Sequence, residues 1–151
     1  MRTVKEMLET KYKPDNFIQP GILVIDAVKK LDSVNLSYLI VMDGDEFKGI
    51  FTERDYTRKL VLKGKSSKET TVEEVMTTDL PEVTLDETVE DCMYKMNTKG
   101  TRYLMAMEDG HFKGIITIHD ILREVIANKG EVFDNSLTSS LLDNDESGAI
   151  F

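Results

Sequence analysis

The sequence has few of the residues on which several classes of protein depend. It holds one cysteine, Cys92, no tryptophan and two histidines among its 151 residues. A single cysteine cannot form an internal disulfide or a cysteine-based metal cluster, and this usage is typical of a reducing compartment. We therefore expect a cytoplasmic protein in which Cys92 is a buried, unreactive hydrophobic residue.

Long apolar runs and an excess of basic charge are also missing. No uncharged apolar run reaches about 18 residues, and the opening segment MRTVKEMLET has no apolar core, so we expect neither a membrane helix nor a secretory signal. Lys and Arg number 19 against 28 Asp and Glu, which gives a formal net charge of −9. This balance disfavours general nucleic-acid binding, although a local basic pocket for a phosphate remains compatible with it.

What the chain does contain is an internal duplication. Residues 38–58 align without a gap to residues 103–123, and 10 of these 21 positions are identical at a constant shift of 65 residues. Average residue usage gives about one or two such identities by chance. A solenoid needs three or more shorter repeats, so the duplication predicts two similar subdomains. The predicted division is repeat 1 (1–65), repeat 2 (66–130) and an acidic tail (131–151).

Hydropathy spacing predicts the same order of elements in both repeats. A short helix is followed by a short extended segment, an amphipathic helix, two strands joined by a tight turn, and a closing helix. The order β-α-β-β-α, found twice, predicts an α/β (α+β) fold. The expected helices are 4–9, 22–33, 53–62, 72–76, 88–97 and 118–127, and the expected strands are 17–19, 38–42, 47–51, 82–84, 103–107 and 112–116.

The tail differs in composition from the repeats. It is rich in Asp, Asn, Ser and Glu with scattered Leu. This composition is typical of a disordered segment. The alternatives are that the tail docks on its own module or on a partner chain.

Two heptapeptides carry the candidate chemistry. GIFTERD (49–55) and GIITIHD (114–120) share the pattern Gly-apolar-apolar-Thr-x-x-Asp, each where a strand passes into a helix. Threonine at a helix start with an aspartate three residues later is also the pattern of a capping box, which needs no ligand. The same geometry suits a nucleotide, because a helix N-terminus attracts phosphate and a carboxylate can accept both hydroxyls of a ribose. Two motifs at the same point of two repeats favour binding more than one would.

The duplicated motif and the β-α-β-β-α order resemble tandem CBS domains, the Bateman module. The resemblance covers about residues 1–128, and the segments IQPGILVIDAVKKL and VTLDETVEDCMYKM add to it. Gly21 departs from the family pattern, in which an acidic residue is common, whereas Asp86 keeps it; Met105 replaces a common proline. The resemblance implies two small three-stranded sheets packed with pseudo-twofold symmetry and two clefts between the repeats.

The resemblance also implies an adenosine-containing ligand such as AMP, ADP, ATP, NAD or S-adenosylmethionine, and no catalytic cofactor. Asp55 and Asp120 would hold ribose hydroxyls, and Thr52 and Thr117 would contact phosphate or ribose. The adenine would lie against the apolar residues Ile18, Ile50, Val83, Ile115, Tyr38 and Tyr103. Each cleft would combine both repeats: the Thr117 motif with Ile18, Gly21, Ser37 and Tyr38, and the Thr52 motif with Val83, Leu85, Arg102 and Tyr103.

Three basic residues, Arg54, Arg102 and His119, stand where the charge of a phosphate could be met. A cation near a helix N-terminus is mildly unfavourable, so Arg54 directly before Asp55 indicates an anion to meet. Arginine can bind phosphate through two parallel hydrogen bonds, whereas histidine binds better when protonated. The alternative is that all three are solvated surface charges.

Catalytic motifs are missing from the sequence. It has no H-E-x-x-H, no G-x-S-x-G and no Walker A loop, so we expect neither an enzyme nor a metal site. The function predicted is a regulatory module that senses an adenine nucleotide and transduces the signal through a ligand-dependent change of packing. It would act as a homodimer on an unknown effector protein, away from nucleic acid and membranes. The alternative is a structural dimerisation or protein-interaction module with empty clefts.

Overall fold

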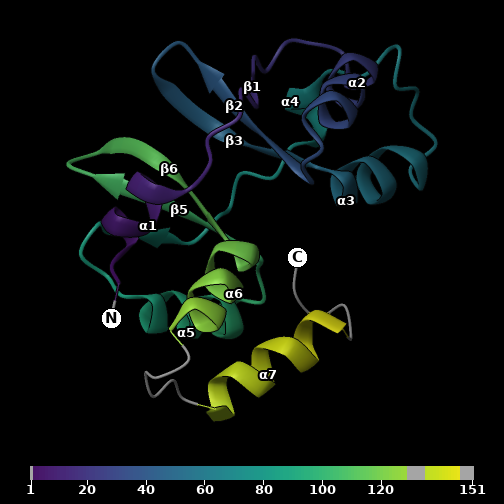
Figure 1. The fold of residues 1–151 in the computed structure, drawn as a ribbon. Helices are drawn as coiled ribbons and strands as arrows, with labels where there is room; N and C mark the ends of the chain where they lie inside the picture. Colours follow the sequence, from purple (N-terminus) through teal and green to yellow (C-terminus); the bar gives the residue numbers. More distant parts are fainter. Residues whose placement is uncertain (1, 129–134, 147–151) are drawn as a thin grey trace. The chain divides into compact units, whose positions relative to one another are not determined.

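The computed structural model of the chain describes residues 2–128 and 135–146, which fall into two compact units (Figure 1). The repeat-1 unit comprises Lys13–Asp79, and the repeat-2 unit comprises Met1–Tyr12 with Leu80–Phe151. These units differ from the predicted division at 65 and 66, because residues 1–12 lie with repeat 2 and residues 66–79 lie with repeat 1.

The repeat-1 unit contains a mixed three-stranded sheet in the order β1-β2-β3. β1 is parallel to β2, and β2 is antiparallel to β3. Gly44 adopts a left-handed conformation (φ 60°) in the tight turn between β2 and β3, as the predicted hairpin requires. The elements are β1 (Phe17–Ile18), α2 (Val24–Val34), β2 (Tyr38–Asp43), β3 (Glu46–Thr52), α3 (Glu53–Asp55), η1 (Tyr56–Val61) and α4 (Val72–Val75).

The repeat-2 unit contains a sheet of the same design in the order β4-β5-β6. The pairing directions are the same, and the bulge between Ala106 and Met107 matches the one between Val41 and Met42. Two such sheets with their helices confirm the predicted α+β fold. The elements are α1 (Val4–Thr10), β4 (Glu82–Val83), α5 (Val89–Lys99), β5 (Tyr103–Glu108), β6 (His111–Thr117), α6 (Ile118–Ala127) and α7 (Asn135–Glu146).

The short helix that opens each repeat in sequence packs in the unit of the other repeat. α1 places Val4 in the repeat-2 core, where the Val4 N–H donates to the Glu87 carbonyl at 2.8 Å. α4 places Val72 in the repeat-1 core, where the Val72 N–H donates to the Ile22 carbonyl at 2.9 Å. Periodicity therefore finds both helices, but these backbone bonds and buried contacts decide which sheet each helix covers.

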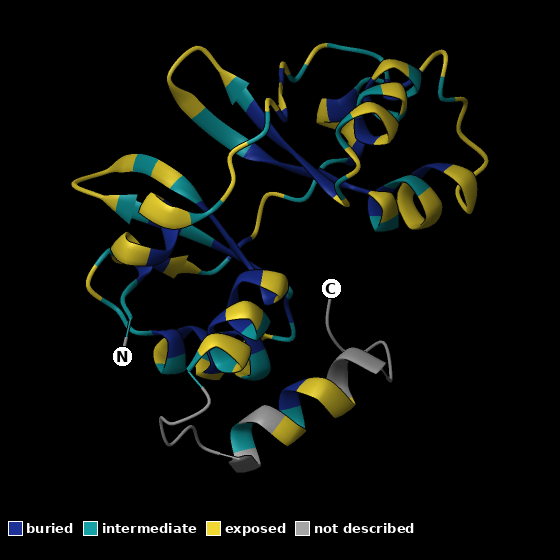
Figure 2. Ribbon diagram, viewed as in Figure 1, coloured by how far each residue is buried: buried dark blue, intermediate teal, exposed yellow. Residues whose placement is uncertain are grey.

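Successive residues of a strand point to opposite faces of its sheet, and β2 is buried over most of its length (Figure 2). In β2, Leu39 and Val41 belong to the core, so Tyr38 and Ile40, which alternate with them, lie on the opposite face. β5 repeats this pattern, with Leu104 in the core of its unit. Side chains on this second face therefore do not contribute to the core of their own unit.

The helix predicted over 53–62 changes form after Asp55. α3 is three residues long and continues as the π-helix η1, in which the Leu62 N–H donates to the Thr57 carbonyl five residues back at 3.0 Å. Hydropathy spacing does not distinguish the two forms over so short a segment. None of the helices in the described part of the chain is long and apolar enough to span a bilayer.

The tail contains a helix, α7, where its composition predicts disorder. α7 packs against α5, Leu141 is buried in the repeat-2 core, and the Ser140 hydroxyl donates to Asn97 Oδ1 at 3.2 Å. Leu137, one turn before Leu141, packs against the same core. Residues 135–146 therefore dock on their own unit, which is one of the two alternatives to the disorder that composition alone indicates. The rest of the predicted tail, 131–134 and 147–151, lies outside the described residues.

Candidate functional site

Both Thr-x-x-Asp motifs form the predicted capping box. The Thr52 N–H donates to Asp55 Oδ2 at 3.0 Å, and the Asp55 N–H donates to Thr52 Oγ1 at 3.1 Å. Between Thr117 and Asp120 the corresponding distances are 2.9 and 3.2 Å. A hydroxyl that accepts a hydrogen bond still carries its own proton, so either threonine can donate to a phosphate oxygen.

Strand pairing places an aromatic and an aliphatic side chain on the same sheet face as each motif threonine. Tyr38 lies opposite Thr52, and Ile40 lies opposite Ile50, so these four share the face turned away from the core. In repeat 2 the matching pairs are Tyr103 with Thr117 and Met105 with Ile115. Each unit therefore combines a hydroxyl, an acid and an apolar face.

The residue that precedes β2 or β5 is hydrogen-bonded to the first residue of the helix that begins at the motif of the same unit. The Glu53 N–H donates to the Ser37 carbonyl at 3.3 Å, and the Ile118 N–H donates to the Arg102 carbonyl at 2.9 Å. These bonds bring the predicted residues Ser37 and Arg102 next to the motifs of their own units.

The other predicted residues have different surroundings. Ile18 and Val83 are buried in the cores of their own units, and Leu85 packs against the repeat-2 core. Gly21 and His119 are exposed, and Arg54 is half-buried. The predicted clefts combine residues that belong to different units, so these combinations remain predictions.

Asp55 is buried and accepts hydrogen bonds from three donors. Besides the Thr52 N–H, Oδ1 receives Lys59 Nζ at 2.9 Å and the Thr77 hydroxyl at 2.8 Å. Thr77 also bridges to Ile50, whose N–H donates to the Thr77 carbonyl at 2.9 Å and whose carbonyl accepts from the Thr77 N–H at 2.8 Å. The segment after α4 is therefore hydrogen-bonded both to the Asp55 carboxylate and to the strand backbone at Ile50.

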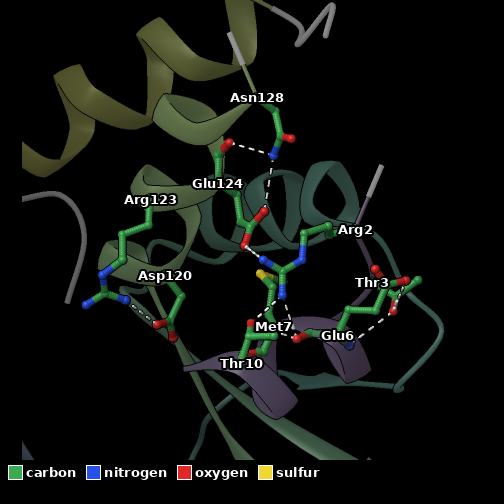
Figure 3. Close-up of polar contacts among 9 residues, drawn as sticks. All are labelled: Arg2, Thr3, Glu6, Met7, Thr10, Asp120, Arg123, Glu124 and Asn128. Carbon is green, nitrogen blue, oxygen red and sulfur yellow. Dashed lines mark hydrogen bonds and ion pairs between the residues drawn. The ribbon is translucent and has the colours of Figure 1, made fainter. Parts of the chain in front are cut away.

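Asp120 is also buried and has three donors, but two of them are cations. Oδ2 accepts from the Thr117 N–H and from Lys11 Nζ at 2.8 Å, and Oδ1 accepts from Arg123 Nη1 at 2.8 Å (Figure 3 shows the Arg123 contact). Lys11 Nζ also donates to the Ile115 carbonyl at 2.9 Å. At this motif the strand carbonyl is therefore bonded by a lysine side chain. Among the described residues, Ile115 has no isolated backbone bridge like the one between Ile50 and Thr77.

A second buried carboxylate lies one turn further along α6 (Figure 3). Glu124 pairs with Arg2 Nη1 at 2.7 Å and accepts from Asn128 Nδ2 at 3.2 Å. Arg2 Nη2 also donates to the Glu6 carbonyl at 2.7 Å and to the Thr10 hydroxyl. Arg2 therefore ties α1 to α6 and balances the charge of Glu124.

Sequence reasoning missed the cations that hold the two aspartates. Lys59 lies four residues after Asp55 on the same helical segment, and that spacing could have indicated the pair. Lys11 is more than a hundred residues from Asp120 in the sequence, so no local pattern indicated this pair. The same holds for the neutral partner Thr77, which is 22 residues from Asp55.

Cys92 is buried on α5, as predicted, and burial raises the pKa of its thiol to about 12, with Glu87 and Asp91 acting in the same direction. At neutral pH the thiol is therefore neutral and a poor nucleophile. Among the described residues, no group of three or more His, Cys, Asp or Glu side chains is placed to hold a metal ion.

Comparison with known proteins identifies the repeats. The model of the CBS domain family matches residues 4–62 and 72–127. A protein with CBS domains from Burkholderia ambifaria has a similar structure (TM-score 0.77, 35% identity, covering 87% of this chain and 99% of that chain). The CBS domain pair of the protein MJ0100, solved with 5′-methylthioadenosine and S-adenosyl-L-methionine, is 27% identical (TM-score 0.69, covering 83% of this chain and 97% of that chain).

This chain matches only part of the length of the first three curated relatives. The mitochondrial CBS domain-containing protein CBSX3 of Arabidopsis thaliana is 36% identical over 108 residues, which is 68% of this chain and 52% of that protein. Across the first three curated relatives the matched part is 45% to 66% of their length.

Proposed function

The chain belongs to the CBS domain family, and on that premise we propose that it is a regulatory module that binds an adenosine-containing ligand. The observation that carries the proposal is the pair of Thr-x-x-Asp motifs, each with a buried aspartate beside a tyrosine and an isoleucine on one sheet face. These groups supply an acceptor for ribose, a donor for phosphate and an apolar surface for adenine. The complex of the related MJ0100 pair with two adenosine compounds supports this ligand class.

The ligands proposed are AMP, ADP, ATP, NAD and S-adenosylmethionine. The ligand would shift the packing of the repeats or of a homodimer, and an effector protein would read that shift in the cytoplasm without any catalytic step. A ligand can shift such an equilibrium only if it binds the two states with different affinities.

A structural dimerisation module is the second candidate. The capping boxes favour it, because they occupy both threonines and both aspartates without any ligand. A module of this kind would keep the motifs for the stability of its helices alone.

Calorimetry and thermal unfolding with AMP, ATP, NAD and S-adenosylmethionine separate these candidates. We expect heat of binding with at least one ligand and a melting temperature that rises with its concentration, because a ligand that binds the folded state stabilises it. No heat and no shift with any of the four would support the structural module. Mass spectrometry of the recovered ligand tests the absence of catalysis, since turnover would change its mass.

A further inference from the structure

We propose that the Asp120 motif selects adenosine 5′-phosphates and that Lys11 is the residue that sets this preference. The preference presupposes the proposed function, and it names the class of ligand at one of the two motifs. It follows from the charge, the burial and the hydrogen-bond capacity of the groups around Asp120.

The charge at the Asp120 motif is positive. One carboxylate is bonded to two cations, Lys11 and Arg123, so the three groups together carry +1. The nearby Glu124 does not change this sum, because Arg2 balances it. At the repeat-1 motif the bonds to Asp55 come from one cation, Lys59, and from the neutral Thr77 hydroxyl. An anion is therefore attracted to the repeat-2 motif.

The hydrogen-bond capacity of Asp120 decides which donor a ribose replaces. An ionised carboxylate offers about four acceptor positions, and three are taken by the Thr117 N–H, Lys11 and Arg123. The two hydroxyls of a ribose need two positions, so one existing donor has to leave. The Thr117 N–H is fixed by the helix start. The Arg123 side chain is 68% exposed, so it gives up its bond to Asp120 most readily while its charge stays beside the motif on α6, whereas the side chain of Lys11 is 15% exposed.

Lys11 therefore remains beside the bound ribose. Its ammonium group has three protons, and Asp120 and the Ile115 carbonyl take two of them. Once ribose hydroxyls share the carboxylate, the buried ammonium is less well compensated, and a 5′-phosphate on the same ribose supplies the missing negative charge. A 5′-methylthio group has no charge to supply, and the sulfonium of S-adenosylmethionine adds a positive one.

The test compares AMP with 5′-methylthioadenosine, two ligands that share adenine and ribose and differ at the 5′ position. Calorimetry on the full chain measures both affinities for the wild type, Lys11→Met and Lys11→Arg. Lys95→Met is a matched control, because Lys95 likewise bonds a carboxylate, Glu87 at 2.7 Å, and a backbone carbonyl, Glu82 at 2.8 Å, in the same unit.

We expect the wild type to prefer AMP. Lys11→Met should lower the AMP affinity by about tenfold, the typical effect of losing one charge-assisted contact, and leave the 5′-methylthioadenosine affinity unchanged or higher. Lys11→Arg and Lys95→Met should keep the preference.

Two other results would overturn parts of this picture. If Lys11→Met weakens both ligands equally, Lys11 does not select for phosphate, and the proposed function still stands. If the wild type binds no adenosine compound at all, the proposed function fails and the preference fails with it. Should Lys11→Met not fold, salt gives the answer on the wild type: added salt should weaken AMP and spare 5′-methylthioadenosine, and an equal response would refute the role of charge.

Discussion

The two Thr-x-x-Asp motifs are near copies in sequence and in backbone, yet their aspartates have different partners. Asp55 is held by Lys59 of its own helical segment and by Thr77, and Asp120 is held by Lys11 and Arg123. The symmetry of the duplication thus extends to the capping boxes, which are built from residues inside each repeat. The symmetry does not extend to the segments that pack in the unit of the other repeat, which are residues 1–12 in the repeat-2 unit and residues 66–79 in the repeat-1 unit.

One substitution accounts for part of this difference. Position 59 of repeat 1 corresponds to position 124 of repeat 2, where the lysine is replaced by a glutamate. Glu124 cannot neutralise Asp120 and needs a cation of its own, which Arg2 provides. The docking of α1 therefore supplies both cations, Lys11 and Arg2, that repeat 2 lacks at this position.

The largest expected difference between the repeats is at the motif glycines. A Cβ at Gly49 would lie 2.4 Å from the carbonyl oxygen of Thr77, a backbone atom, whereas a Cβ at Gly114 would meet Cδ2 of Leu8 at 2.8 Å, the end of a flexible side chain. The φ angles of the two glycines are 157° and 158°, so the conformational cost is the same. We expect Gly49→Ala to lower the free energy of unfolding by about 3 kcal/mol and Gly114→Ala by about 1 kcal/mol. Urea unfolding measures both, and equal losses would show that the Thr77 segment yields as easily as Leu8.

The docked tail belongs to the repeat-2 unit and gives the next largest effect. Leu141 is buried in that core, so Leu141→Ala should lower the free energy of unfolding by about 2 kcal/mol. The neighbouring Leu142 is 44% exposed, and Leu142→Ala should change stability by less than about 0.5 kcal/mol. If the two variants unfold at the same urea concentration, α7 contributes little to the stability of the unit.

The two motif aspartates should differ in ligand binding. Asp120→Ala should make the free energy of AMP binding less favourable by about 1–3 kcal/mol, the cost of losing charged hydrogen bonds to the ribose. Asp55→Ala should weaken AMP binding less, because the uncharged Thr77 segment is bonded both to Asp55 and to the N–H and carbonyl of Ile50, whereas Asp120 is held by two cations that can face a phosphate. Calorimetry measures both affinities, with melting curves to account for the lost capping boxes. A larger loss of AMP affinity for Asp55→Ala would indicate that AMP binds at the repeat-1 motif instead.

The smallest expected effect concerns Cys92, which corresponds to Ala27 of repeat 1. Burial raises the pKa of the Cys92 thiol to about 12, so at pH 8 it stays protonated. We expect iodoacetamide to leave the folded protein unmodified and to label it fully in denaturant, as mass spectrometry would show. Cys92→Ala, which copies repeat 1, should cost about 1 kcal/mol of stability or less. Rapid labelling without denaturant would mean that α5 opens readily.

The features predictable from the sequence were those that depend on neighbouring residues. The hairpin turns at Gly44 and Gly110, and the capping boxes at Thr52 and Thr117, follow from residues a few positions apart. The helix α7 was not predictable from composition, since its buried contacts depend mainly on Leu137 and Leu141 meeting α5.

By itself the sequence determined two copies of β-α-β-β-α, a tight turn in each hairpin, and a capped helix start with an aspartate three residues after the capping threonine in each copy. The tertiary structure alone decided that α1 covers the repeat-2 core and α4 the repeat-1 core, and hence that Lys11 reaches Asp120 while Thr77 reaches Asp55. The physical reason is that hydrophobic burial is not directional. An apolar stripe requires that a helix be covered, but only packing and backbone bonds between distant segments select the surface that covers it.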